Sequence, residues 1–484
     1  AEKGLNEQEK AFLETAGARI SELRTAQQTF FLGIDLLLDF RMQCVDAESR
    51  IILSENSHVL FAGAVKTSFE LFRLTGDRAH LLAAFHSSER ARGLNLQEAR
   101  RKVEVLGSLP IPPGTLDKIK GLQRDLAFYQ GKALREEARG VRMDSTKFET
   151  WKSLVFDLRE KLQMLEAEAK KAYPEFADYQ SEITTLNAGK IADSLLNVDE
   201  LLIEIFQSST EVFVFGLSKH NFTARVLPFN SAHQRLLQSY VRSISNYEFI
   251  HDSTAHAWRD FTRSAHALYQ ILLAPELREH PGIRSLTVVP DGPYHFVPFE
   301  SFLTALPTDS SVQFNALPYL LNDLDVQYAD AGSLLPFPTK PTHLPEARCL
   351  AIAGSYANRP NSPESGSLQT LRDQAGNLPG AHAEVQAIAS QGFAGRFLLG
   401  KRATEAQFKS QASDYSILHL ALHGVSDPAE PLNSHIMFSP ESDTTEDGNL
   451  YAHEIAGLTQ SSDLVVLSAC ETGAGKIRQG EGAM

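Results

Sequence analysis

Cysteine is scarce in this chain of 484 residues, which has three, Cys44, Cys349 and Cys470, far apart in the sequence. Such wide spacing predicts neither a disulfide framework nor a zinc site built from paired cysteines. Reduced thiols are the rule inside cells, so we expect a cytoplasmic protein. We also expect its chemistry to use no metal and no organic cofactor.

Long apolar runs and an excess of positive charge are lacking as well. The most apolar stretch, residues 30–40, is interrupted by Asp35 and Asp39, so no membrane span is predicted. Lysine and arginine number 46 against 60 aspartates and glutamates, a formal net charge of -14 at pH 7. We therefore expect no direct binding to nucleic acid or to a membrane surface, because the chain repels phosphate on average.

Apolar residues are plentiful, at 43% of the chain, and their spacing in residues 1–108 is helical. Phe61, Val65, Phe69 and Phe72 share one face, the turn Thr75-Gly76-Asp77 follows, and the pattern restarts at Leu81, Ala84 and Phe85. This pattern predicts an antiparallel helical hairpin. Such a hairpin cannot bury its own face, so we expect stacked helical repeats, with an ordinary helical bundle as the alternative.

Residues 109–185 predict a long helical hairpin. The turn at 109–114 is rich in proline, and Thr115 stands where it would cap the next helix. The apolar residues of the two helices are Leu116, Ile119, Leu122 and Leu126, then Trp151, Leu154, Leu158, Leu162 and Leu165. We expect the mixed charges of residues 135–142, near the junction, to be solvated.

Strand patterns begin beyond Ala188. Residues 211–217 and 221–229 alternate, and short apolar runs follow at 286–289, 326–328, 350–353, 397–399, 417–422 and 464–467. Runs that are apolar on both faces fit strands covered by helices on each side, so the fold class is α/β with a mainly parallel sheet. The proline-rich stretch 336–345 is a predicted linker, which divides this region into 186–340 and 341–484.

Two of these runs end in residues that together suggest chemistry. One ends in His423-Gly424 and the other leads into Cys470. In open α/β sheets reactive groups gather at the carboxyl ends of strands. If the strands are neighbours, His423 can take the thiol proton and later protonate a leaving amine, as in a cysteine hydrolase. The amides of Gly424 and Cys470 are the candidate oxyanion hole.

Several ordered motifs resemble the CHAT family, caspase-like cysteine peptidases of clan CD that often follow tetratricopeptide repeats in bacteria. The motifs are FELFRLTGDRAHLLAAFHSSERARGLNL at 69–96, VVPDGPYHFVPFESF at 288–302, LPGAHAEVQAIAS at 378–390, LHLALHG at 418–424, PLNSHIMFSP at 431–440, DGNLYAHEIAGL at 447–458 and LVVLSACETGAGKIRQGEG at 464–482.

The resemblance implies a cysteine endopeptidase with His423 as general base and Cys470 as nucleophile. It implies tetratricopeptide-like repeats in 1–108, a catalytically silent caspase-like half in 186–340 and a catalytic half in 341–484. The expected partners are a protein substrate and a regulatory protein that binds the helical repeats. The alternative is a catalytically silent scaffold that keeps the fold for protein binding.

Three positions depart from the family pattern. Leu422 stands where the family usually has a small hydroxylated residue, which affects packing. Met484 follows Cys470 by 14 residues, whereas the family domain normally continues, so we expect a truncated chain, or a processed one with a companion chain. Ser468 occupies the pocket position where arginine-preferring relatives often have aspartate. We expect a neutral residue before the scissile bond, because serine supplies no countercharge.

Other motifs have weaker alternatives. GAGK at 473–476 fails as a phosphate loop, because Cys470 and Ile477 occupy the positions of the first glycine and of the metal-binding hydroxyl. His419 is expected to be a core histidine and His453 a structural one. Cys349 and Cys44 are expected to be buried and unreactive. A general α/β hydrolase would need a nucleophile-elbow motif, which Cys470 lacks.

Overall fold

The computed structural model describes residues 7–43, 47–94, 96–97, scattered positions between 114 and 136, and 143–172. It further describes residues 185–308, 313–335, 348–356, 378–426, 434–440, 446–455, 458, 462–469, 477–478 and 482–483. Contacts divide the chain into two units. The first comprises residues 1–105, 178–340 and 477–483, and the second comprises residues 106–177, 341–476 and 484.

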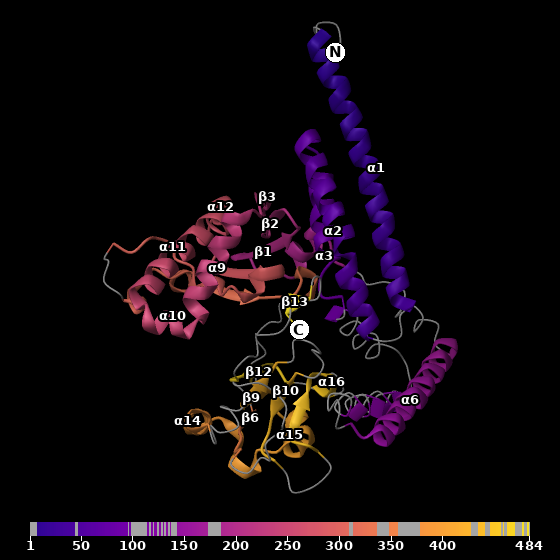
Figure 1. Cartoon of the computed structure of the whole chain (residues 1–484), viewed down its shortest axis with the longest axis vertical. Coiled ribbons are helices and arrows are strands. Elements are labelled where there is room, and N and C mark those ends of the chain that lie inside the picture. Colours follow the sequence, from indigo (N-terminus) through magenta and orange to yellow (C-terminus); the bar gives the residue numbers. More distant parts are fainter. Residues whose placement is uncertain are drawn as a thin grey trace. The chain divides into compact units, whose positions relative to one another are not determined.

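The first unit begins with three helices, α1 (Glu7–Gln43), α2 (Ala47–Thr75) and α3 (Arg78–Glu89). Helices α1 and α2 lie side by side and run antiparallel, as Figure 1 shows, and the Gln27 amide donates to Ser68 Oγ across them at 2.7 Å. Gly76, at φ +70°, makes the predicted turn before α3. The helices are not stacked short pairs, however, since α1 alone has 37 residues, more than a whole two-helix repeat of about 34.

A five-stranded sheet in the order β3-β2-β1-β4-β5 forms the centre of the first unit. Its strands are β1 (Glu200–Gln207), β2 (Glu211–Leu217), β3 (Phe222–Pro228), β4 (Ser285–Val289) and β5 (Asp325–Tyr328). The pairs β1-β4 and β4-β5 are parallel, as predicted, whereas β1-β2 and β2-β3 are antiparallel. Short turns after β1 and β2 produce this mixed sheet, because a parallel pair needs a long crossover.

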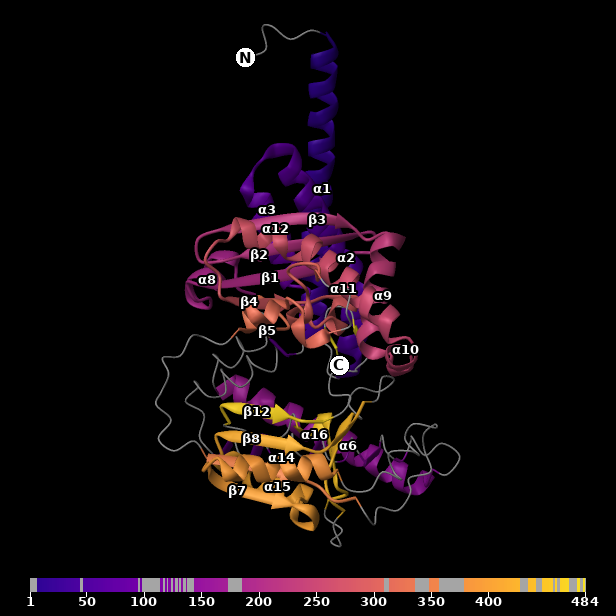
Figure 2. The same cartoon turned by 90° about the vertical axis from the view of Figure 1, so that its left-hand side faces the viewer.

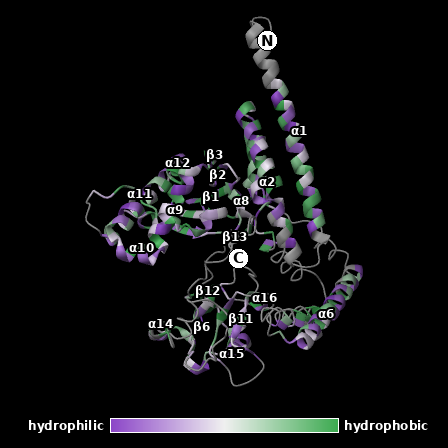
Figure 3. Ribbon diagram, in the orientation of Figure 1, coloured by the Kyte–Doolittle hydropathy of each residue, from purple (hydrophilic) through white to green (hydrophobic). Residues whose placement is uncertain are grey.

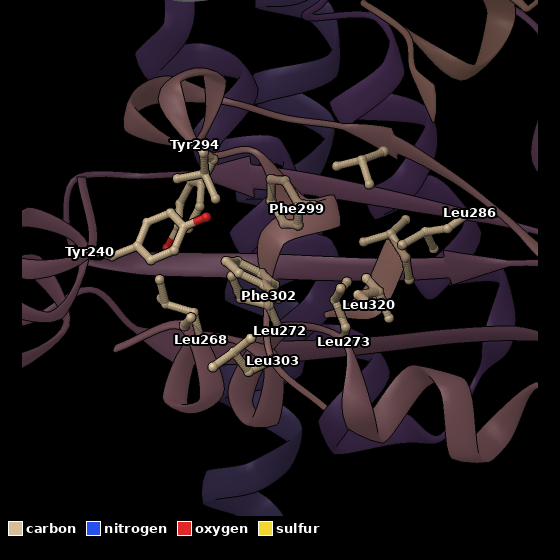
Figure 4. Close-up of a cluster of buried hydrophobic side chains, with 14 of the residues drawn as sticks. Tyr240, Leu268, Leu272, Leu273, Leu286, Tyr294, Phe299, Phe302, Leu303 and Leu320 are labelled. Carbon is tan, nitrogen blue, oxygen red and sulfur yellow. The ribbon is translucent and has the colours of Figure 1, made fainter. Parts of the chain in front are cut away.

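Helices cover both faces of this sheet. One face packs on α9 (Ser231–Ser245) and α11 (Thr254–Leu272), where Tyr240 meets Phe302 edge-on at 5.5 Å between ring centroids (Figure 4). The other face packs on α2, α3 and α8 (Ala188–Ser194), where Phe85 meets Phe215. Other elements of the unit include α10 (Tyr247–Asp252), α12 (Ala274–Glu279), β13 (Ile477–Arg478) and β14 (Gly482–Ala483).

The second unit contains α6 (Ser145–Ala172), the second of the two predicted long helices, which carries hydrophilic and hydrophobic residues along its length (Figure 3). The described positions between 114 and 136 include helical ones, and Lys132 Nζ lies 5.8 Å from the Trp151 ring centroid. The expected solvation of residues 135–142 is wrong at Glu136, the described member of that run. Glu136 is buried, and its carboxylate accepts the Asp144 N–H at 2.8 Å.

A four-stranded parallel sheet in the order β7-β6-β8-β12 is the core of the second unit (Figure 2). Its strands are β6 (Arg348–Ala353), β7 (Ala394–Leu399), β8 (Ile417–Ala421) and β12 (Leu464–Leu467), all at predicted positions. Helix α14 (Pro379–Ser390) covers one face and α15 (Glu405–Gln411) the other. A separate antiparallel sheet contains β9 (His423–Val425), β10 (His435–Met437) and β11 (Asn449–Tyr451), followed by α16 (Ala452–Ile455).

The predicted linker at 336–345 lies outside the described residues. The four-part division at 108, 185 and 340 stays a prediction.

The close approach of β6 and β7 gives a test of the parallel sheet. A Cβ added at Gly395 would lie 1.9 Å from the Cys349 carbonyl oxygen of β6. We expect Gly395→Ala to lower the free energy of unfolding by about 1–3 kcal/mol, because the backbones must separate. Gly380→Ala, whose added Cβ meets nothing within 4 Å, is the matched control. Equal thermal melting of the two variants would contradict the described pairing.

Candidate active site

Strands β8 and β12 are parallel neighbours, so their carboxyl ends lie at the same edge of the sheet. Their register pairs Val466 with His419 and Leu467 with Leu420. The ladder continues one step further, because Ser468 N donates to Leu420 O at 2.9 Å. Cys470, two residues beyond Ser468, lies outside the described residues, as do all four residues of the GAGK motif.

His423 does not end strand β8, as the sequence predicted, but begins β9. Strand β8 stops at Ala421, and Leu422 turns the chain with its side chain in the core, where it is 1% exposed. His423 then pairs with Met437 and Gly424 with Ile436 in the antiparallel sheet. The imidazole therefore stands where two sheets meet.

Tyr356 fixes the position of His423. The two rings lie 4.7 Å apart between centroids, and the Tyr356 hydroxyl oxygen accepts the His423 backbone N–H at 3.2 Å. The same hydroxyl donates to the Met437 carbonyl of β10 at 2.8 Å. His423 is half-buried and Gly424 is buried. The roles of general base for His423 and of oxyanion donor for Gly424 stay predictions.

Ser468 and His419 share one carboxylate, that of Glu384 on α14. Ser468 Oγ donates to Glu384 Oε2 at 3.0 Å, and His419 Nε2 lies 2.9 Å from Glu384 Oε1. The prediction that His419 is a partnered core histidine is confirmed. Ser468 itself supplies no charge, but the Glu384 carboxylate reaches it from another element, and the expected neutral residue before the scissile bond stays a prediction. Glu384 is the one acidic residue in the sequence of α14, which was the available signal.

Three further carboxylates surround a lysine. Lys409 Nζ lies 2.7 Å from Glu405, 2.9 Å from Glu446 and 3.3 Å from Glu454. These carboxylates are near enough to one another to hold a metal ion, but the Lys409 ammonium group already pairs with all three. Burial raises the pKa of Glu405, and Lys409 opposes that rise. We call Lys409 and its three glutamates the lysine hub, and it is structural.

Two other predicted residues can be placed. Cys349 lies in β6 and is 2% exposed, and burial raises the pKa of its thiol. The prediction that it is buried is therefore confirmed. His453 lies in α16. Cys44 lies outside the described residues.

The C-terminal part of the chain is similar to a known protein family. Residues 262–484 match the family model of the CHAT domain. This part of the chain is a CHAT domain. CHAT domains are caspase-like, so the predicted fold class, a caspase-like α/β region behind helices, is confirmed. The match begins within α11, after β1, β2 and β3 of the first sheet.

No curated protein matches the chain. None of the described helices combines the length and the hydrophobicity needed to cross a membrane.

The lysine hub gives a stability prediction. We expect Lys409→Met to lower the free energy of unfolding by about 2–4 kcal/mol, because it leaves three carboxylates without their cation. The loss should be larger at pH 8 than at pH 5. A carboxyl group with a raised pKa in the folded state loses stability as pH rises through that pKa. Denaturant unfolding at both pH values measures the effect. Lys401→Met, at an exposed lysine, is the control, and equal losses would contradict the hub.

Cys349 gives a reactivity prediction. Because burial raises its thiol pKa and excludes reagent, we expect iodoacetamide to leave Cys349 unmodified in the folded chain at neutral pH. The same cysteine should react fully in denaturant. Mass mapping of the peptide that contains Cys349 checks both states. Rapid alkylation without denaturant would show that β6 is not covered as described.

Proposed function

We propose that this CHAT domain is a cytoplasmic cysteine endopeptidase that cleaves a protein substrate, with Cys470 as nucleophile and His423 as general base. The observation that carries the proposal is the parallel pairing of β12 with β8. Cys470 follows Ser468 by two residues, which span at most about 7 Å, and His423 follows Leu420 by three, at most about 11 Å. Since Ser468 N bonds Leu420 O, the described ends of β8 and β12 lie at one edge of the sheet.

The proposed reaction needs these two side chains and backbone amides. The sulfur of Cys470 attacks the carbonyl carbon of the scissile bond as its proton passes to His423. The C–N bond then breaks, and His423 returns the proton to the amine. Water hydrolyses the thioester, which restores the thiol. The amides of Gly424 and Cys470 are the proposed donors to the oxyanion.

Two observations at His423 support its role. His423 is half-buried as a residue, and it is held from two directions by Tyr356 and by the ladder to β10. A general base must be oriented to act efficiently. The His423 ring packs on Tyr356, whose hydroxyl also accepts the His423 backbone N–H, so the ring has little freedom to turn.

The N-terminal helices are the proposed site of a regulatory protein partner. Leu32, Leu36 and Phe40 of α1 follow one another at spacings of four residues and are 60%, 60% and 58% exposed. Four-residue spacing places them on one helix face. Exposed apolar side chains in a row are typical of a protein interface. Helix α1 packs on α2, which covers the first sheet, so a partner bound there would act on that unit.

The decisive variant is Cys470→Ala. We expect it to abolish cleavage, and His423→Ala to lower cleavage at least about a thousandfold, because each removes a group that forms or breaks bonds. Proteomic detection of new protein termini, with the full chain and candidate partners, measures the loss. Cys349→Ala should leave cleavage unchanged.

Partner binding should survive in Cys470→Ala, and a pull-down with that variant checks it. Cleavage that persists without Cys470 would refute the protease. A cellular phenotype that is the same with and without Cys470 would favour the alternative, a CHAT scaffold that binds proteins without cutting them.

A further inference from the structure

Glu384 brings a negative charge to the position that precedes Cys470 by two residues. Its two oxygens lie 2.9 Å from His419 Nε2 and 3.0 Å from Ser468 Oγ. Val466 pairs with His419, and strand side chains alternate, so Ser468 shares with His419 the face that α14 covers. The carboxylate is therefore fixed at the carboxyl edge of β12 by two contacts from two strands.

The Glu384 carboxylate can accept further hydrogen bonds from a ligand. A carboxylate accepts about four hydrogen bonds, and the contacts to Ser468 and His419 use two. The side chain of Glu384 is 37% exposed. Among the described residues no lysine or arginine pairs with it, and its one ion-pair partner there is His419. The charge is thus oriented, partly dehydrated and open to solvent on one side.

We infer that Glu384, held by Ser468 and His419, selects a lysine or arginine side chain immediately before the scissile bond. The inference rests on the proposed protease function. A guanidinium or ammonium group pairs with an oriented, partly buried carboxylate more strongly than with an exposed one. An acidic side chain would be repelled there. Ser468 alone suggested a preference for a neutral residue before the scissile bond. Together with Glu384 it favours a basic residue there.

Binding to the Cys470→Ala chain tests the selection without catalysis. The probes are two pools of heptapeptides with random flanks, one with arginine at the centre and one with citrulline, which has the same shape and no charge. We expect the immobilised full chain to retain the arginine pool at least about fivefold better, as quantified by mass spectrometry. Adding Glu384→Gln should bring the ratio to about one.

Two control variants separate a specific pocket from the attraction of any cation to a chain of net charge -14. Asp463→Asn removes the same charge just before β12 begins, at the opposite end of that strand, and should keep the ratio. Ser468→Ala removes one hydrogen bond to Glu384 and should lower the ratio partially. Circular dichroism checks that each variant is folded. An unchanged ratio in Glu384→Gln, or no retention of either pool, overturns the inference.

Cleavage of the same pools by the chain with Cys470 intact separates this inference from the proposed function. Cutting after arginine that Glu384→Gln abolishes supports both. Cutting after neutral residues alone overturns the role of Glu384 and leaves the protease standing. Retention of arginine peptides that depends on Glu384, without any cutting, supports the pocket and refutes the protease.

Discussion

The parallel pairing of β12 with β8 is the constraint on which the candidate site depends. Residues 423 and 470 are far apart in the chain, and the parallel ladder brings the ends of β8 and β12, the strands that precede them in the sequence, to one edge. An antiparallel β12 would carry Cys470 to the opposite edge. The bond from Ser468 N to Leu420 O extends the ladder to the point where the loops begin. In this CHAT domain, the proposed pairing of His423 with Cys470 therefore depends on the direction of β12.

A second set of interactions joins the N-terminal helices to the first sheet. Arg92, just after α3, is buried and donates from Nε to Glu204 of β1 at 3.2 Å and from Nη1 to the Pro290 carbonyl at 2.9 Å. Burial and the neighbouring Glu89 raise the pKa of Glu204, which accepts hydrogen bonds from this guanidinium and from the Ser88 hydroxyl. Glu89 accepts the backbone N–H of Gly332 at 2.7 Å. Helices and sheet thus form one unit, so the helices are part of a core rather than an appended module.

The sequence predicted most strands of the two larger sheets because each is a short apolar run of strand length. It missed β1, whose apolar run contains Glu200 and Glu204, since their partners Thr287, Gln327 and Arg92 come from distant segments. It found His423 but not the break at Leu422, because β8 and β9 read as one apolar run. It missed Glu384 for a similar reason. The packing of α14 on the sheet decides which strand ends the Glu384 carboxylate reaches. The spacing of residues in the sequence does not reveal that packing.

The lysine hub has a consequence for the imidazole. Glu405 accepts the Gly448 N–H and Glu454 accepts the Tyr451 N–H, each at 2.9 Å, so the hub holds both ends of β11. Strand β11 pairs with β10, and β10 with β9, which begins at His423. Opening of this small sheet alone would withdraw His423, the proposed base, while the four parallel strands stay intact. Most optical probes would report such a protein as native, although His423 would be displaced from the candidate site. The fraction with His423 in place is then set by local opening of the β9-β10-β11 sheet rather than by global unfolding.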